Sequence, residues 1–583
     1  MTFEQIALLA LLLGLMATFA LDRWRVEVVA LAGLAAAFLL GLVPAEGVFS
    51  GFADPAVITV IEILIIADVI GHSRAVDILA RKVTGAALGE SAMVALLCGV
   101  AAGVSIFMNN VGALALMLPI AYSVSVARRM PLRTLLLPMS FATLLGGLCS
   151  LIGTPANLVV SNAAATATGT GFGFFAFAPI GLALTVLGIL WLALVGWRML
   201  LGGGDDVPGD RHYPTDLFLT EVAVPLGSAL AGRNVSDIER DNNVSVHGAF
   251  RADARIFARK ENQILAENDL LLLSGTVESI RAFLRRHSLR PAVSGSPSAI
   301  PAERAWVEIV VMPQSTIIGS AVGAIAAFMK RDIQVVAISP QGPRIEGRLG
   351  DVAPMIGDIL LLHGARSDIS DALRETQSVP IATRSILFTG SDAIMPLLIF
   401  AAAIVLAAVG IVPTSIAFGG AVLLMALTGV LDIRNAIREL NWPVIVMLAA
   451  MLPIGEALAT TGTAELIARW GLGILGTPSE TMLVGGILLA AIIITPFLNN
   501  VTTAVILAPI AIAVAAGAGI PSAPLLVAVA VGASTDFLTP FGHHNNTLVM
   551  GIGHYRFIDF PRVGAPLTLM VLLVAPPLIA AVF

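Results

Sequence analysis

Long apolar runs are the feature that most constrains this chain. Each is at least as long as the about 17–25 residues that a helix needs to cross a bilayer, and some are long enough for two helices. Only 12% of the 583 residues are charged, about half the fraction usual in soluble domains. Helices are favoured over other folds because unpaired backbone groups are too costly in lipid. We therefore expect an all-α polytopic membrane protein whose apolar runs lie near 4–21, 27–44, 54–71, 91–127, 134–165, 176–199, 386–408, 411–430, 442–459, 481–516, 522–550 and 563–583.

The middle of the chain has an ordinary polar composition and repeats within itself. The block Glu221–Pro225 recurs as Glu308–Met312, and the block Asn268–Leu272 recurs as Gly357–Leu361. Alternating apolar residues and turn signals predict strand, helix, strand, turn and strand in each unit. No Gly-x-Gly-x-x-Gly follows a predicted strand, so no dinucleotide cofactor is expected. The predicted organisation is a first membrane repeat, 1–204, two α/β modules, 205–295 and 296–384, and a second membrane repeat, 385–583.

The basic residues predict the orientation in the membrane, because cytoplasmic loops near spans are enriched in Lys and Arg. Arg25 places the first loop inside and the N-terminus outside. Lys82 and Arg128 flank the run 91–127 on both sides, so this run is expected to enter from the cytoplasm and return as a re-entrant hairpin. Arg562 closes the topology inside, before the last run. These positions predict a multi-pass inner (plasma) membrane protein with a cytoplasmic insert and both termini outside.

The two membrane halves repeat one another. Phe107–Val111 matches Phe497–Val501 at a shift of 390 residues, and Gly153–Asn157 matches Gly542–Asn546 at a shift of 389. The predicted topology gives the two halves opposite orientations, with a second re-entrant hairpin in the run 481–516. Inverted repeats with helices broken near the bilayer midplane are typical of secondary transporters.

Tandem asparagines stand at the expected tip of each hairpin. A buried amide needs hydrogen bonds or a ligand, because an unsatisfied polar group is costly in lipid. At a helix break, freed carbonyls can coordinate Na⁺, and helix N-termini can face an anion. We expect Asn109–Asn110 to form one clamp with Gly153–Asn157, and Asn499–Asn500 to form another with Gly542–Asn546. The alternative is that these asparagines only join the hairpin tips to neighbouring helices.

In these segments the chain resembles the divalent anion:sodium symporter family. Members of that family follow each tip with a Gly-Thr-Pro-Pro-Asn-type loop, which Gly153–Leu158 fits well, and Gly551–Phe560 resembles their C-terminal signature. The insert resembles two TrkA-C modules, the C-terminal ligand-binding modules of regulators of potassium conductance. The resemblance implies a scaffold domain and a moving transport domain, arranged as a homodimer that works by an elevator motion.

The resemblance also implies the residues that bind ligands. Each tip and its facing loop would hold one Na⁺, with a hydroxyl before the tip. The implied first cation site is Ser105, Asn109, Asn110, Gly153 and Asn157, and the second is Thr495, Asn499, Asn500, Gly542 and Asn546. The implied substrate residues are Asn109, Asn110, Val111, Thr154, Pro155, Asn499, Asn500, Val501, His543 and His544.

The tips depart from the family pattern, which is Ser-Asn-Thr. The serine and threonine positions are occupied here by Asn109 and Val111 in the first tip, and by Asn499 and Val501 in the second. Those hydroxyls hold substrate carboxylate in family members, so sulfate and a dicarboxylate both stay open, with a slight preference for an inorganic anion. His543 and His544 stand where the other half has Thr154–Pro155. Imidazoles there can donate to sulfate, take part in proton coupling or simply pack.

Acidic residues within apolar runs are functional candidates, because a buried charge is expensive. Asp68 and Glu456 occupy matching positions near the ends of spans, where an interfacial place is expected. Glu62 lies within a span, and Asp536 lies near the expected break of the run 522–550. Of these four, Asp536 is the favoured candidate for cation coupling.

The expected function is Na⁺-coupled symport of a small divalent anion across the lipid bilayer, with Na⁺ as coupling ion. The resemblance adds the hypothesis of a cytosolic small-molecule ligand at the insert. A ligand-gated ion channel and a proton-coupled anion transporter are the alternatives, and broken helices within one chain favour alternating access over a continuous pore. No span contains a nucleophile–base pair or metal-ligand spacing, so an enzyme is not expected. The net charge of −6 gives no sign of nucleic-acid binding, and Cys98 and Cys149 form no disulfide framework.

Overall fold

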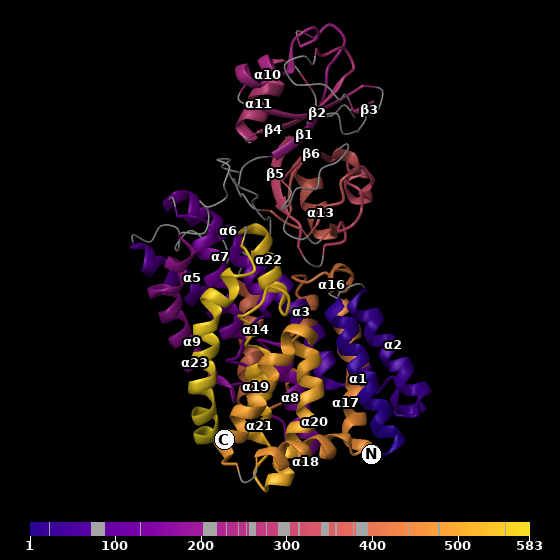
Figure 1. The fold of residues 1–583 in the computed structure, drawn as a ribbon, viewed down its shortest axis with the longest axis vertical. Helices are drawn as coiled ribbons and strands as arrows, with labels where there is room; N and C mark the ends of the chain where they lie inside the picture. The colour runs from indigo at the N-terminus through magenta and orange to yellow at the C-terminus, as the bar shows by residue number, and fades with distance from the viewer. Residues whose placement is uncertain are drawn as a thin grey trace. The chain divides into compact units, whose positions relative to one another are not determined.

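A computed structural model gives the fold in two compact units, one formed by Met1–Gly202 with Phe388–Phe583 and one formed by Gly203–Leu387 (Figure 1). We call them the membrane unit and the insert. The structure describes residues 1–21, 24–71, 88–128, 130–201, 218–228, 230–242, 244–251, 254–255, 264–275, 277–287, 289, 304–312, 315–339, 349–355, 358–376, 378–380, 394–440, 442–475, 478–553 and 555–583. Lys82 and the side chain of Asp68 lie outside the described residues.

The first half of the membrane unit is helical wherever it is described. Its helices are α1 (Phe3–Leu21), α2 (Val26–Leu39), α3 (Pro55–Gly71), α5 (Glu90–Ser105), α6 (Asn110–Arg128), α7 (Arg133–Gly147), α8 (Pro155–Thr168) and α9 (Ala178–Leu194), with 3₁₀ turns at Ala45–Gly47, Ser50–Ala53 and Gly196–Leu200. Each of the six predicted runs contains one or two of these helices. The run 91–127 is broken after Ser105 and the run 134–165 after Gly147.

The second half follows a similar order. Its helices are α14 (Ile394–Ala408), α15 (Thr414–Leu427), α16 (Ile433–Glu439), α17 (Trp442–Thr460), α18 (Thr463–Leu475), α19 (Glu480–Leu498), α20 (Asn500–Ala518), α21 (Ala523–Ala533), α22 (His544–Ile552) and α23 (Asp559–Val582). Among the described residues, five helices are long and apolar enough to cross a membrane, and others are shorter apolar helices. These elements confirm the expectation of a helical, multi-pass membrane protein.

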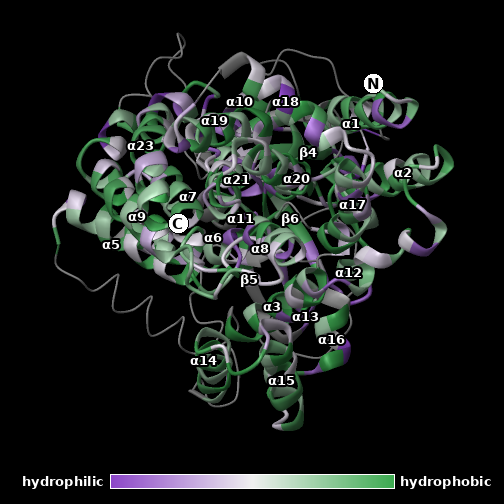
Figure 2. Ribbon diagram, turned by 90° about the horizontal axis from the view of Figure 1, so that it is seen from below, coloured by the Kyte–Doolittle hydropathy of each residue, from purple (hydrophilic) through white to green (hydrophobic). Residues whose placement is uncertain are grey.

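Burial separates the outer helices of the membrane unit from the inner ones. Five large apolar side chains of α14 and α15 are exposed: Leu398, Val405, Ile416, Leu423 and Leu427. Figure 2 shows both helices coloured as predominantly hydrophobic. Such a surface suits contact with lipid. In contrast, almost every residue of α7 and α21 is buried. The helices that precede two of the breaks are therefore interior.

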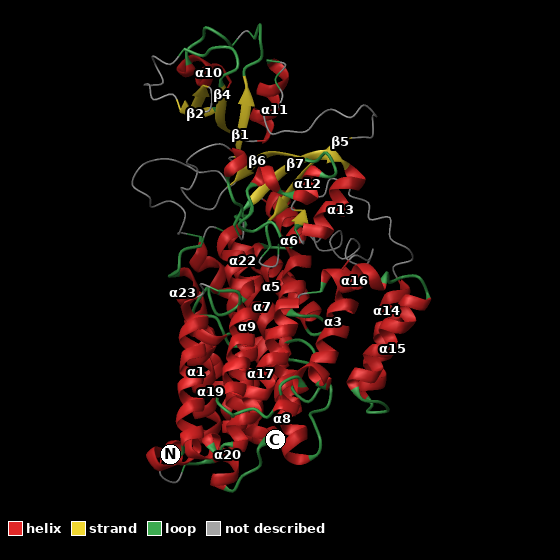
Figure 3. Cartoon of the chain, turned by 90° about the vertical axis from the view of Figure 1, so that its right-hand side faces the viewer, coloured by secondary structure: helices red, strands yellow, loops and turns green. Residues whose placement is uncertain are grey.

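The insert is built on one antiparallel sheet, and the strands of the described chain all belong to it (Figure 3). The strand order is β3-β2-β4-β1-β6-β7-β5-β8. The strands are β1 (Phe218–Ala223), β2 (Ser245–Arg251), β3 (Ala254–Arg255), β4 (Leu270–Gly275), β5 (Arg304–Val310), β6 (Gln334–Ser339), β7 (Ile359–Ala365) and β8 (Val379–Pro380). Its α-helices are α10 (Val235–Asn242), α11 (Val277–Arg286), α12 (Ala326–Met329) and α13 (Arg366–Thr376).

The two halves of this sheet have the same register. Glu221 of β1 lies opposite Leu272 of β4, and Glu308 of β5 lies opposite Leu361 of β7, at the positions that the sequence repeat aligns. Both halves also have a β-bulge at matching positions, after Val246 in one and after Val335 in the other. The strands β1 and β6 then pair with each other and join the halves into one sheet.

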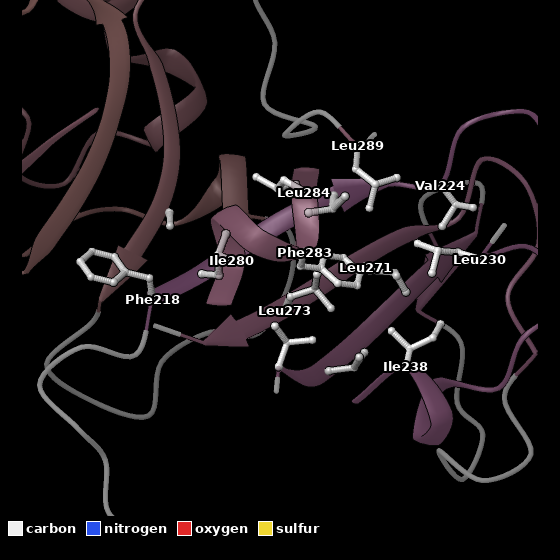
Figure 4. Packing of buried hydrophobic residues seen from close by; sticks show 14 of the residues in the cluster. Phe218, Val224, Leu230, Ile238, Leu271, Leu273, Ile280, Phe283, Leu284 and Leu289 are labelled. Atoms are coloured by element: carbon white, nitrogen blue, oxygen red, sulfur yellow. The ribbon is translucent and has the colours of Figure 1, made fainter. Parts of the chain in front are cut away.

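The packing of the insert follows from its alternating apolar strands. Figure 4 shows Ile280, Phe283 and Leu284 of α11 beside Leu271 and Leu273 of β4. This cluster also contains residues of the second half of the sheet, whereas a second cluster surrounds α13. The described cores are thus filled by the apolar residues that the strand and helix patterns predict.

Candidate functional site

Four helix breaks form the candidate site of the membrane unit. They separate α5 from α6, α7 from α8, α19 from α20 and α21 from α22. After two of these breaks, an asparagine caps the helix that follows. Asn109 Oδ1 accepts a hydrogen bond from Gly112 N at 2.8 Å, and Asn499 Oδ1 accepts one from Thr502 N at 3.0 Å. Asn499 also has a left-handed φ of 64°, which turns the chain sharply between α19 and α20. Asn499 therefore ends α19 and starts α20, whereas Asn109 only starts α6, because α5 already ends at Ser105.

The second asparagine of each pair points to another break. Asn110 is buried, accepts a hydrogen bond from Ser105 Oγ at 2.8 Å and lies 3.3 Å from His543 Nε2 through its Nδ2. Asn500 donates through Nδ2 to Thr154 Oγ1 at 3.2 Å. Each tip thus touches the residue that precedes the second broken helix of the other half. His543 and Thr154 occupy equivalent places, immediately before α22 and α8.

The two loop breaks share one hydrogen-bonding pattern. Asn157 donates through Nδ2 to the carbonyls of Gly147 at 3.2 Å and Ser150 at 2.7 Å. In the other half, Asn546 donates through Nδ2 to the carbonyls ten and seven residues before it, those of Asp536 at 2.7 Å and Thr539 at 3.0 Å. One asparagine therefore closes each break by satisfying two carbonyls that no helix uses.

A hydroxyl completes this pattern in both halves. Ser150 Oγ accepts from Gly153 N at 3.1 Å, and Thr539 Oγ1 accepts from Gly542 N at 3.4 Å. The pattern matches residue for residue at the shift of the sequence repeat, so the repeated sequence folds into a repeated local structure.

The halves differ at one position of the pattern, where Gly147 corresponds to Asp536. A Cβ at Gly147 would overlap Asn110 Oδ1 and lie 3.1 Å from the carbonyl of Gly153, so only glycine leaves room for the tip amide there. In the second half the carboxylate of Asp536 lies against Gly542, where an added Cβ would overlap Oδ2. The first break therefore presents a neutral amide oxygen at a place where the second presents a carboxylate.

Four helix N-termini meet in this region. The start of α6 contacts the start of α22, because Asn545 Nδ2 donates to the carbonyl of Asn110 at 3.0 Å, and Figure 1 shows these two helices side by side. The start of α20 contacts the start of α8 through Asn500 and Thr154. Helix N-termini carry partial positive charge and free N–H groups, which suit an anion. The sequences of the breaks contain no Lys or Arg, so full positive charge must come from another source.

Unsatisfied polar atoms gather at the same breaks. Among the described residues of the membrane unit, the buried side-chain atoms without a hydrogen-bond partner include five at the breaks: Asn157 Oδ1, Thr502 Oγ1, Ser534 Oγ, Asp536 Oδ2 and Asn545 Oδ1. Four of the five lie in the second half. Because buried oxygens are normally paired, such a cluster indicates a place for ligands.

Except for Thr495, the remaining residues implied by the resemblance lie in the first turns of the helices that follow the breaks. Thr495 is buried, and its Oγ1 donates to the carbonyl of Ala491 at 2.7 Å within α19, so it meets the tip through its backbone carbonyl, which accepts from Asn499 N at 2.9 Å. Pro155 is the first residue of α8, and Val501 is buried beside the tip. Val111 follows Asn110 in the first turn of α6, and His544 is the first residue of α22.

The sequence reasoning missed several contributors, among them the hydroxyls of Ser150 and Thr539 described above and two further side chains. Asn545 lies inside a block that the repeat had aligned, and its side chain joins Asn110 to Thr143, with Nδ2 2.8 Å from Thr143 Oγ1. Ser140 donates through Oγ to Asn546 Oδ1 at 2.8 Å from the middle of α7. The first had a usable signal in the motif, whereas the second lies in an apolar helix with no motif around it.

The acidic candidates are placed apart. Glu62 lies on α3, where a Cβ at Gly419 of α15 would be 2.8 Å from its Oε1, and its Oε2 has no hydrogen-bond partner. Glu456 lies on α17. Only Asp536 lies at a break. Among the described residues, no group of three or more His, Cys, Asp or Glu side chains could hold a metal ion, so a cation at the breaks would need neutral oxygens among its ligands.

In the insert, the best-formed ionic contact is structural. Arg251 of β2 donates to both carboxylate oxygens of Asp269 at 2.7 Å, and Asp269 Oδ2 also accepts from Ala266 N at 2.7 Å. Burial opposes ionisation of Asp269, but these hydrogen bonds and the charge of Arg251 outweigh it and lower the pKa of the carboxyl. Asp358 repeats the backbone contact in the second half, where its Oδ2 accepts from Met355 N at 2.9 Å. These aspartates fix the turns before β4 and β7.

Comparison with known proteins identifies relatives over the full length. A sequence model of the citrate transporter family matches residues 16–478 and 474–583. An uncharacterised transporter of Escherichia coli is 30% identical, with 100% of both chains covered. An uncharacterised transporter of Synechocystis is 28% identical over 99% of this chain and 96% of its own. Sodium/sulfate cotransporter 2 of Chlamydomonas reinhardtii is 25% identical over 54% of this chain and 38% of its own.

Proposed function

The chain belongs to the citrate transporter family, and from this premise we propose that it is a secondary active transporter that couples Na⁺ to the uptake of a small divalent anion. The observation that carries the proposal is the reciprocal contact of the tips, in which Asn110 meets His543 and Asn500 meets Thr154. It joins the two halves where four helix N-termini lie. Each of the two halves supplies one tip and one broken helix.

A charge argument supports cation coupling. A dianion at this depth needs about two positive charges, because an uncompensated charge is costly in the membrane. A helix N-terminus carries partial charge only, and its effect on an anion is about 0.3–1 kcal/mol, up to about 2 kcal/mol in partly buried sites, so the four N-termini do not replace two full charges. The breaks have no basic side chain, so cations carried with the anion supply the missing charge. The freed carbonyls and amide oxygens of the breaks are the type of ligand that Na⁺ takes in transporters.

Among divalent anions we place sulfate first. The tip hydroxyls that bind carboxylate in the divalent anion:sodium symporters are replaced here by Asn109, Val111, Asn499 and Val501. Amides, a hydroxyl and an imidazole remain as donors. Several relatives carry the name sodium/sulfate cotransporter, which agrees with this choice. A dicarboxylate and citrate are the next candidates.

The proposal extends to the movement and the assembly. We propose an inverted repeat with two re-entrant hairpins, both termini outside and the insert in the cytoplasm of an inner-membrane protein. The tips and broken helices would move together as a transport domain in an elevator motion within a homodimer. The insert would act as a pair of TrkA-C-like modules that respond to a cytosolic small molecule.

The test is uptake of radiolabelled sulfate, succinate and citrate into proteoliposomes, under an inward Na⁺ gradient or an equal K⁺ gradient. Asn110→Ala and Asn500→Ala each remove a donor from the site, and Thr166→Ala, an exposed change on α8, is the control. A hydrogen bond to a charged group contributes about 1.5–3 kcal/mol. We expect Na⁺-driven sulfate uptake that falls about tenfold or more in both asparagine variants and stays unchanged in the control.

Two results would contradict the proposal. Uptake that is equal under Na⁺ and K⁺ but follows a proton gradient would establish the proton-coupled alternative. Flux that follows the anion's own gradient alone would indicate a channel.

A further inference from the structure

We infer that Asp536 is a ligand of a monovalent cation that binds at the second break before any anion arrives. This inference rests on the proposed cation coupling and gives it an order. It starts from the burial of Asp536, whose surface is 1% exposed, and from its Oδ2, which has no hydrogen-bond partner. Its other oxygen, Oδ1, accepts from Thr539 Oγ1 at 3.3 Å. A carboxyl oxygen buried and left open in this way is stable only if the group takes up a proton or gains a positive ligand, and its surroundings decide between the two.

The surroundings of Oδ2 suit a cation. The point that a Cβ of Gly542 would occupy is overlapped by Oδ2 and lies 2.8 Å from Cα of Pro496, so the carboxylate is beside the last turn of α19. The C-terminal end of a helix carries partial negative charge and carbonyls without helical donors. Pro496 lacks an N–H, so the carbonyl four residues earlier also loses its helical donor. Asp536 itself follows the end of α21, which brings a second helix C-terminus to the same place.

No basic side chain of the breaks neutralises the carboxylate of Asp536. No lysine or arginine occurs in the breaks, and no ion pair of Asp536 is found among the described residues. His543, the nearest titratable residue of the break in sequence, uses Nδ1 to accept from Asn545 N at 3.2 Å and directs Nε2 to Asn110. Both ring nitrogens of His543 therefore have partners other than Asp536.

The comparison of the two halves gives the binding order. At the first break, the position of Asp536 is Gly147, and a neutral amide oxygen of Asn110 lies beside it. A cation at that neutral site adds a full positive charge, so an anion nearby favours its binding. At the second break the carboxylate neutralises the cation within the protein. The second site therefore fills without the anion, and the first fills together with it.

The experiment measures binding of ²²Na⁺ to the full-length purified protein in nanodiscs without any transported anion, at constant ionic strength maintained with choline. Asp536→Asn keeps the shape of the side chain and removes the charge. Glu62→Gln is the matched control, because Glu62 also has a buried oxygen without a partner but lies on α3, beside Gly419 of α15. We expect wild type and Glu62→Gln to bind Na⁺ equally, and Asp536→Asn to bind at least about tenfold more weakly, the effect of losing about 1.4 kcal/mol.

A second measurement shows that the asparagine variant is folded. Thermal unfolding is followed in the same nanodiscs, with and without Na⁺. Removal of an uncompensated buried charge should raise the Na⁺-free melting temperature of Asp536→Asn, and its Na⁺-induced increase should vanish. Thr539→Val removes the hydroxyl that donates to Oδ1 and accepts from Gly542 N but keeps the carboxylate, so it should weaken Na⁺ binding by less than Asp536→Asn does.

Equal Na⁺ binding by Asp536→Asn and wild type would overturn the inference, as would a wild type that binds no Na⁺ until sulfate is added. Its failure can be told apart from failure of the proposed function. Na⁺-driven anion uptake with unchanged binding in Asp536→Asn would remove the inference alone. Anion-free binding at Asp536 without Na⁺-driven uptake would remove the proposed function and keep the site.

Discussion

Asn157 and Asn546 offer a direct test of whether the two breaks are held in the same way. Each donates two buried hydrogen bonds to break carbonyls, and Asn546 in addition accepts one from Ser140. Side-chain hydrogen bonds between helices in membrane proteins contribute about 0.6–1.7 kcal/mol each. Replacement by alanine should therefore destabilise the membrane unit by about 1–3 kcal/mol for Asn157→Ala and about 2–5 kcal/mol for Asn546→Ala.

The chain contains its own reporters for this measurement. Cys98 and Cys149 are buried in the membrane unit and become accessible to a thiol-reactive dye only on unfolding. We expect the melting temperature to fall in the order wild type, Asn157→Ala, Asn546→Ala. Thr166→Ala, which loses one exposed bond on α8, should melt with wild type. An Asn157→Ala variant as stable as Thr166→Ala, or one less stable than Asn546→Ala, would refute the bond count.

Four further outcomes are expected. Gly147→Ala should abolish anion uptake although the variant still folds by the thiol assay, because its Cβ would displace the Asn110 amide. Tyr555→Phe should lower the melting temperature by the equivalent of about 1–3 kcal/mol, since its hydroxyl contacts backbone groups of α7 from the segment before α23. Phe283→Ala should destabilise the insert by about 3–5 kcal/mol, measured by hydrogen exchange in β4, because its ring is 1% exposed. Because folding lowers the pKa of Asp269, its carboxylate stabilises the insert at pH values above the ordinary aspartate range, and this contribution is lost as the pH falls through the pKa of the folded state. Arg251→Met should therefore make hydrogen exchange in β4 less sensitive to acid, after correction for the intrinsic exchange rates.

The local features of the membrane unit were predictable because each depends on short stretches of sequence. Apolar runs determine where helices can lie, and Asn-Asn and Gly-x-Pro punctuation determines where they break. Repetition at a constant shift predicted that Asn157 and Asn546 would have equivalent surroundings, and their hydrogen bonds agree. The same reasoning could not separate the roles of Asn109 and Asn110. One caps a helix and the other faces the opposite half, and this depends on the direction in which the chain turns.

The sequence by itself thus determined a helical membrane protein with a β-rich insert, four helix breaks and two repeated motifs, because hydropathy, periodicity and turn chemistry act over a few residues. Only the tertiary structure decided the partners across the halves. Asn110 meets His543, 433 residues away, and Asn500 meets Thr154, 346 residues away. It also decided that Asp536 faces Gly542 with an open oxygen. Such contacts follow from how distant helices pack, and packing selects among many pairings that the local sequence allows equally.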